Sequence, residues 1–185
     1  MILLKYLKNK FYWIITVIIT LICFFIIIYM AFDSIQYNFL DMSKINEKTV
    51  DYVYVVSSNL MLIAKNYLLG ILTFGIYTIF SLINNVVSLG IISNSLVHSN
   101  KIRLFYKLIP HGVFEIFGMV VSLTAVLYII LIGIRYIPKV VKRETSIKCV
   151  VENICYFLIA TFILDVFIFL IAGIVEVIVS VVKLN

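Results

Sequence analysis

The chain has 185 residues, the size of one ordinary domain, but 64% of them are hydrophobic and only 13% are charged. A soluble domain needs about a quarter of its residues charged. This composition excludes a free soluble enzyme, a secreted disulfide scaffold and a disordered tail. The apolar runs lack the alternation of barrel strands, so we expect an all-α, polytopic helical membrane bundle. The net charge of +6 comes from short Lys and Arg groups between these runs, which is typical of membrane flanks and not of nucleic-acid binding.

The first predicted membrane segment is 11–32, which follows Lys5, Lys8 and Lys10 and contains no charged residue. A crossing needs about 20 apolar residues, and a signal-peptide core has only roughly 7–15. The next stretch, 33–58, carries four acidic residues and two lysines. Because cytoplasmic flanks are richer in Lys and Arg, we predict a cytoplasmic N-terminus and an external loop at 33–58.

Residues 66–100 contain no charged side chain. As one helix they would run about 52 Å, which is too long for one crossing and short for two ordinary ones. Small and polar residues recur at steps of three and four, which favours one continuous helix face. These residues are Asn66, Gly70, Thr73, Tyr77, Ser81, Asn84 and Ser88. The pair Asn84-Asn85 favours a break, and we predict two segments, 66–83 and 85–99.

Two basic stretches decide the number of crossings. Residues 101–107 carry three positive charges, and residues 135–148 carry five positive charges and one negative charge. Only one apolar segment, 112–134, separates them, so both cannot lie in the cytoplasm. We place the longer and more basic loop, 135–148, in the cytoplasm. With a last segment at 153–182, this predicts about five membrane segments in a single transmembrane domain, 1–185, and the count stays open between four and six.

Acidic side chains inside the apolar runs need an explanation, because each costs roughly 2.5–3.5 kcal/mol to insert. Asp165 and Glu176 are 11 residues apart, close to three helical turns, so they face the same way about 16 Å apart. They indicate either a substrate or ion path or hydrogen bonds to a neighbouring helix. Glu115 lies four residues after His111, near the start of a helix that we predict to begin at Pro110.

Patterns for catalysis or metal binding are weak. His111 and Glu115, with His98 as a third ligand, would suit zinc, but zinc normally takes three or four ligands and the chain has two histidines. We therefore predict no metal and no cofactor. No intramembrane-protease pattern and no P-loop is present, so we predict no enzymatic activity.

The motif Pro110-His111-Gly112 followed by Glu115 is the most specific in the chain. Together with further positions in the stretch 59–134, it resembles the stage II sporulation protein M family. The further matching positions are Asn66, Gly70, Asn84, Asn85 and Gly90. The resemblance implies a small multi-pass protein of the bacterial cell membrane without an established enzymatic activity.

The resemblance also implies partners. The type member acts with peptidoglycan-degrading proteins during engulfment in spore formation. Other members are encoded beside circular bacteriocins and are implicated in peptide maturation, export or producer immunity. We therefore expect a non-enzymatic component of a membrane complex, whose partners are other membrane proteins (a peptidoglycan-remodelling or ABC-transporter complex) or a hydrophobic peptide. A homo-oligomer is left open.

The same resemblance marks a set of residues. We expect a buried polar or partner-binding cluster made of Asn66, Asn84, Asn85, His111, Gly112 and Glu115. The alternative from another functional class is a small transporter or channel that uses Asp165 and Glu176 as an intramembrane path.

Overall fold

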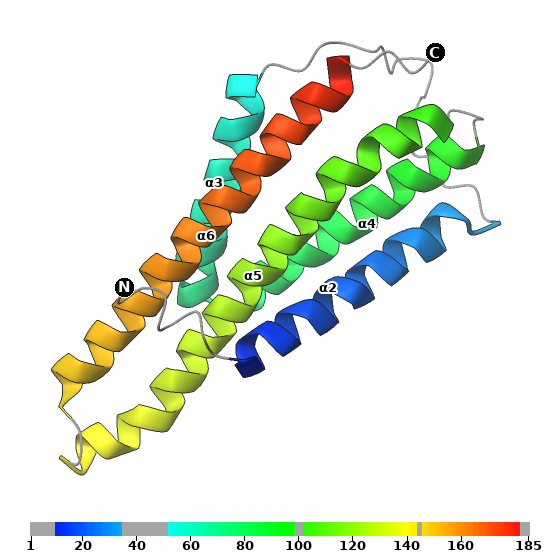
Figure 1. Cartoon of the computed structure of the whole chain (residues 1–185). Coiled ribbons are helices and arrows are strands. Elements are labelled where there is room, and N and C mark those ends of the chain that lie inside the picture. Colours follow the sequence, from blue (N-terminus) through cyan, green and yellow to red (C-terminus); the bar gives the residue numbers. More distant parts are fainter. Residues whose placement is uncertain (1–9, 35–51, 99–101, 144–145, 182–185) are drawn as a thin grey trace.

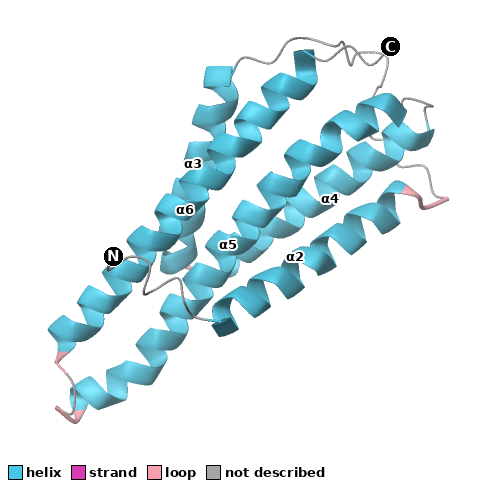
Figure 2. Cartoon of the chain, viewed as in Figure 1, coloured by secondary structure: helices cyan, strands magenta, loops and turns pink. Residues whose placement is uncertain are grey.

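The chain folds into a bundle of α-helices. The computed structural model describes residues 10–34, 52–98, 102–143 and 146–181. The helices are α2 (Lys10–Ala31), α3 (Tyr52–Leu72), α4 (Ile76–His98), α5 (Ile102–Val141) and α6 (Ile147–Val181). α2, α4 and α6 run in one direction, and α3 and α5 run in the opposite direction (Figure 1). Figure 2 shows no strand in the described part of the chain, which confirms the predicted all-α fold.

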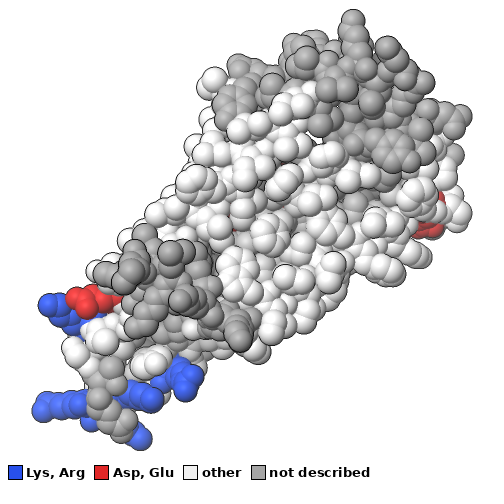
Figure 3. All heavy atoms as spheres, viewed as in Figure 1, with Lys and Arg blue, Asp and Glu red and all other residues white. Residues whose placement is uncertain are grey.

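Four stretches of helix are long and apolar enough to cross a membrane. They are Phe11–Ala31, Ile76–His98, Leu108–Val141 and Ile147–Val175. The apolar part of α3, Val56–Leu72, is shorter, at about 26 Å of helix. Figure 3 shows a broad surface without charged side chains between the two ends of the molecule. Such a surface is stable in lipid, and the protein is a multi-pass membrane protein.

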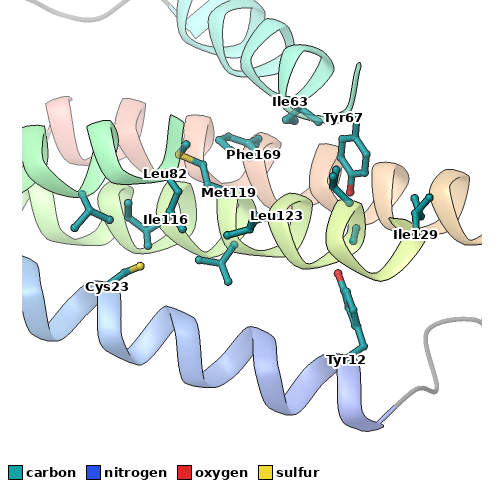
Figure 4. Packing of buried hydrophobic residues seen from close by; sticks show 14 of the residues in the cluster. Tyr12, Cys23, Ile63, Tyr67, Leu82, Ile116, Met119, Leu123, Ile129 and Phe169 are labelled. Carbon is teal, nitrogen blue, oxygen red and sulfur yellow. The ribbon is translucent and has the colours of Figure 1, made fainter. Parts of the chain in front are cut away.

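α5 is the central helix, because it packs against every other described helix. Its middle part is the best buried stretch of the molecule, and Ile116, Met119 and Val120 are 0% exposed. Side chains from the surrounding helices meet around it, among them Cys23, Leu82 and others in the cluster of Figure 4. The core of the protein therefore follows α5.

The chain reverses direction at Thr73–Gly75, between α3 and α4, and not at Asn84-Asn85 as the sequence predicts. Phe74 and Gly75 have positive φ angles of 53° and 87°. The Gly75 amide donates to the Gly70 carbonyl (2.6 Å), and the Phe74 amide donates to the Ile71 carbonyl (3.3 Å). These two bonds form a Schellman cap, which satisfies the carbonyl groups at the end of α3.

The asparagine pair lies inside α4, and the helix continues through it. The Asn85 side-chain amide donates to the Ser81 carbonyl one turn earlier (3.0 Å). The polar residues at steps of three and four therefore belong to two helices and form no continuous face. The predicted segment 66–83 instead covers the C-terminal part of α3, the turn and the start of α4, and the predicted segment 85–99 covers the rest of α4.

Three predicted loops are shorter in the structure. α3 already begins at Tyr52, inside the predicted loop 33–58, where residues 35–51 lie outside the described part. α5 begins at Ile102, so the basic stretch 101–107 is helical from its second residue, and Pro110 lies inside the helix. A proline inside a helix removes one backbone hydrogen bond and crowds the carbonyl one turn earlier, but α5 continues through Pro110. Lys and Arg are good helix formers, and α5 likewise extends into the predicted loop 135–148.

The two basic stretches lie at opposite ends of α5. This arrangement agrees with the sequence argument that only one of them is cytoplasmic. The assignment of the N-terminus and of residues 135–148 to the cytoplasm remains a prediction.

Candidate functional site

The interior of the bundle holds a polar pair that joins α3 to α6. The Tyr67 hydroxyl donates to Oδ2 of Asp165 at 2.8 Å. Tyr67 is 4% exposed and Asp165 is 0% exposed. The Tyr67 ring packs edge-on against Phe162, with ring centroids 5.6 Å apart. Asp165 therefore lies inside the protein and accepts a hydrogen bond from a neighbouring helix. This bond is the alternative that the sequence offered to a substrate or ion path.

A second polar contact joins α2 to α5. The Tyr12 hydroxyl donates to the Val121 carbonyl at 3.0 Å, and the hydroxyls of Thr16 and Thr124 are 2.9 Å apart. The Tyr12 ring also packs edge-on against Phe157 of α6, at 5.5 Å. These contacts fasten the N-terminal end of α2 to the centre of the bundle.

The two tyrosines approach α5 from opposite sides. Figure 4 shows the Tyr12 hydroxyl directed inward from α2 and the Tyr67 hydroxyl directed inward from α3. Tyr12 lies within electrostatic range of Asp165. The polar contacts of α2, α3, α5 and α6 thus gather at one level of the bundle, around Asp165.

Several buried polar atoms near the middle of the bundle have no hydrogen-bond partner in the described part of the chain. They are Oδ1 of Asp165, both side-chain amide atoms of Asn66 and the amide nitrogen of Asn59. Asn66 contributes its backbone carbonyl to Thr78, whose hydroxyl donates at 3.1 Å. Buried polar groups are usually paired, so each of these atoms has unused bonding capacity.

The predicted cluster of motif residues does not come together. Asn66 is buried beside Thr78, whereas Asn84 is exposed and Asn85 is half-buried on α4. Gly112 packs against Leu89. Asn84 is therefore not buried as predicted, and a partner-binding role for these residues stays a prediction.

The positions along α5 show the separation. Gly70, one turn after Asn66, lies against Val126, and Gly112 precedes Val126 by 14 residues, or about 21 Å of helix. Glu115 is half-buried. The side chains of His111 and Glu176 lie outside the described residues, so the predicted path from Asp165 to Glu176 stays a prediction.

The motif end of α5 instead lines an apolar groove. The groove lies between α2, α4 and α5, has a volume of about 210 Å³, and includes Ile28, Leu89, Gly112 and Val113 in its walls. Ile28 and Val113 are also exposed on the outer surface. This groove is therefore open toward the lipid, and its chemistry suits apolar groups only.

Metal ligands do not gather in the described part of the chain, where no three residues among His, Cys, Asp and Glu lie close enough to hold an ion. His98 is instead bonded to the Asp33 carbonyl, at 2.8 Å. Asn94 also donates to that carbonyl, at 3.2 Å. These bonds hold the C-terminal end of α2 against α4.

Sequence reasoning missed Tyr67, which bonds to Asp165, and the buried polar face of α2. Tyr12, Thr16 and Thr20 follow one another at steps of four on α2, and all three are buried. That spacing was visible in the sequence and marks a buried helix face. Tyr67 carried no such signal, because a tyrosine in an apolar run also suits a membrane interface.

Comparison with known proteins identifies the family. The sequence profile of stage II sporulation protein M matches residues 7–181. A relative from Methanocaldococcus jannaschii, described as an uncharacterized protein, is 34% identical over 121 residues. The match covers 60% of this chain and 66% of that protein, just under two thirds of its length. No solved structure matches. The profile match extends over nearly the whole chain, and the protein belongs to the stage II sporulation protein M (SpoIIM) family.

Proposed function

We propose that this protein works without catalytic chemistry, as an integral subunit of a larger membrane protein complex. The observation that supports this function best is the end of the α5–α6 hairpin, residues 131–143 and 146–156, which we call the hairpin tip. α5 and α6 continue there past the described ends of α2, α3 and α4 (Figure 1). The hairpin tip is a surface that the other described helices leave uncovered.

The hairpin tip combines apolar side chains with positive charge. Ile134, Ile137, Val141 and Ile147 are between 63% and 76% exposed. Lys and Arg side chains gather at the same end of the molecule (Figure 3). They are Arg135, Lys139, Lys142, Arg143 and Lys148. Cations are costly in hydrocarbon, and a contiguous apolar surface in water usually marks an interaction site.

A partner with an apolar helix face and neighbouring acidic side chains would cover both parts of this surface. The apolar residues supply the contact area, and the cations supply orientation and partner choice. In this proposal the hairpin tip lies at the cytoplasmic face of the membrane, because Lys and Arg favour that side. The partner is then a membrane protein that exposes an acidic segment on the same side.

Crosslinking from single positions tests the proposal. A photoreactive residue at Ile137 is expected to yield one discrete protein adduct in native membranes. Phe25 of α2 is the matched control, because it is 72% exposed on a helix face that we expect to contact lipid. The same residue at position 25 is expected to yield lipid adducts.

Neutralising two cations of the hairpin tip tests whether the crosslinked partner is recognised through positive charge. In the double variant Lys142→Gln and Arg143→Gln, the protein adduct at position 137 should weaken by about tenfold, the effect of losing roughly 1.4 kcal/mol of contact energy. If position 137 gives the same lipid products as position 25, or if neutralisation leaves the adduct unchanged, the hairpin tip is not the partner site.

For the pathway of the complex we propose two settings, both suggested by the resemblance to the family: peptidoglycan remodelling during spore formation, and maturation, export or immunity for a circular bacteriocin. The genes next to this one separate the two, since a bacteriocin precursor gene beside it favours the second setting.

A further inference from the structure

The centre of α6 places a carboxyl group in the protein interior, far from both ends of the helix. Asp165 is 18 residues from Ile147 and 16 residues from Val181, or about 27 Å and 24 Å along the helix axis. Its neighbours on the buried face of α6 are Thr161 and Phe169. Of the buried residues in the described part of the chain, Asp165 is the one with an acidic or basic side chain.

Among the described residues, no cation compensates a negative charge at this position. Within the described part of the chain, Asp165 forms no ion pair with Lys, Arg or His, and its hydrogen bond comes from the neutral Tyr67 hydroxyl. The titratable groups that face it are Tyr67 from α3 and Tyr12 from α2. α5 contributes the hydroxyl of Thr124 to the same region. An ionised carboxylate would therefore be buried without a counter-charge, which is among the costliest arrangements inside a membrane.

The two oxygens of the carboxyl differ in their surroundings. Oδ2 accepts the hydrogen bond from Tyr67, whereas Oδ1 is buried without a hydrogen-bond partner in the described residues. We propose that Asp165 is an intramembrane proton-binding site, in which Oδ1 takes up the proton and Tyr67 holds the carboxyl in place through Oδ2. The ligand is a proton because a metal ion would need several further oxygen ligands, and the described residues offer no cluster of acidic or His side chains around Asp165.

Proton binding here would act on the packing of two helices. The Tyr67–Asp165 bond is the described polar link between α3 and α6. When the proton is present, the pair is neutral and the helices pack closely. When the proton leaves, the carboxylate carries an uncompensated charge between α3 and α6, and the packing must loosen or admit water. The inference concerns this site alone and does not depend on the hairpin tip.

Infrared spectroscopy of the protein in liposomes tests the inference directly. A protonated carboxylic acid has a carbonyl stretch well separated from carboxylate bands. We expect such a band at neutral pH, expect ¹³C labelling of aspartate to shift it, and expect Asp165→Asn to abolish it. Transfer to D₂O should shift the band further, because a proton that exchanges with the solvent becomes a deuteron.

Two further variants make the assignment independent of the folding of Asp165→Asn. Tyr67→Phe should retain the band but move it to higher frequency, since Oδ2 loses its hydrogen bond. Glu152→Gln is the matched control, because Glu152 is exposed on the same helix, and it should leave the band unchanged. The inference is overturned if aspartate labelling shifts no carboxylic acid band at neutral or mildly acidic pH. It is also overturned if the band is lost on adding Na⁺ at constant pH, which would indicate a metal-cation site.

Discussion

The middle of α5 and its C-terminal end are built from similar residues but have different surroundings. Ile116 is 0% exposed, whereas Ile137 is 63% exposed. A Cβ atom on Gly118 would come within 2.5 Å of the Phe169 ring, whereas a Cβ atom on Gly133 would meet nothing within 4 Å. The middle is therefore specified by the shape of its neighbours within the chain. The end belongs to a surface that the other described helices leave uncovered.

This difference matters more in a membrane than in water. Lipid tails are as apolar as leucine, so apolar composition alone does not drive helices together, and close packing does. Two isoleucines of one helix can then contribute very differently to stability. The predictions below compare such positions, from the largest expected effect to the smallest.

Ile116→Ala should destabilise the bundle by about 2–5 kcal/mol, because it leaves a cavity among residues that are already close-packed. Ile137→Ala, the same substitution at the hairpin tip, should change stability by less than about 0.5 kcal/mol, as is usual for a surface position. Reversible unfolding in mixed detergent micelles measures both. Equal losses for the two variants would contradict the contrast between the two regions.

Gly118→Ala should cost about 1–3 kcal/mol, because the added methyl group forces the buried Phe169 ring to move. Gly133→Ala should stabilise the protein by up to about 1 kcal/mol, since alanine favours the helix and has free space there. Thermal melting of the two variants side by side checks the pair. A loss at Gly133 would mean that another protein packs against this position.

Thr16→Val should cost about 0.6 kcal/mol and at most about 1.7 kcal/mol, the range for one hydrogen bond between membrane helices. Thr16 pairs with Thr124 across the helix boundary. Thr20→Val is the control, because Thr20 donates to the Thr16 carbonyl on its own helix. If the free energy of unfolding falls equally in both variants, the contact between α2 and α5 does not stabilise the protein.

The sequence predicted α2 best, because charged residues mark where its apolar run begins and ends. α2 begins and ends within one residue of the predicted segment 11–32, because a long run without charged side chains leaves few other choices. α6 ends close to the predicted segment 153–182 but begins six residues earlier, at Ile147, and so includes the charged Lys148 and Glu152. The turn at Thr73–Gly75 was missed because Gly75 was not weighed as a break signal. The asparagine pair was chosen as the break, although glycine is the better residue for the positive φ angle that the turn requires.

Of the Tyr67–Asp165 pair, only Asp165 was predicted from the sequence. Asp165 stood out because an acid in an apolar run needs a partner, but Tyr67 lies 98 residues away in the chain. Such a pairing depends on which helices become neighbours, and no local pattern encodes that. The motif around Gly112 was found as a pattern, but its place beside an apolar groove follows from the packing of α2, α4 and α5.

The short turn between α3 and α4 bears on how the chain enters the membrane during synthesis. The turn uses its own amides to cap α3, and residues 66–100 carry no charged side chain. With the predicted cytoplasmic N-terminus, this turn stays on the cytoplasmic side of the bilayer, so no polar loop between α3 and α4 has to cross the lipid. α3 and α4 can therefore leave the insertion machinery together, as one preformed hairpin, before the long α5 is synthesised and fills the space between them.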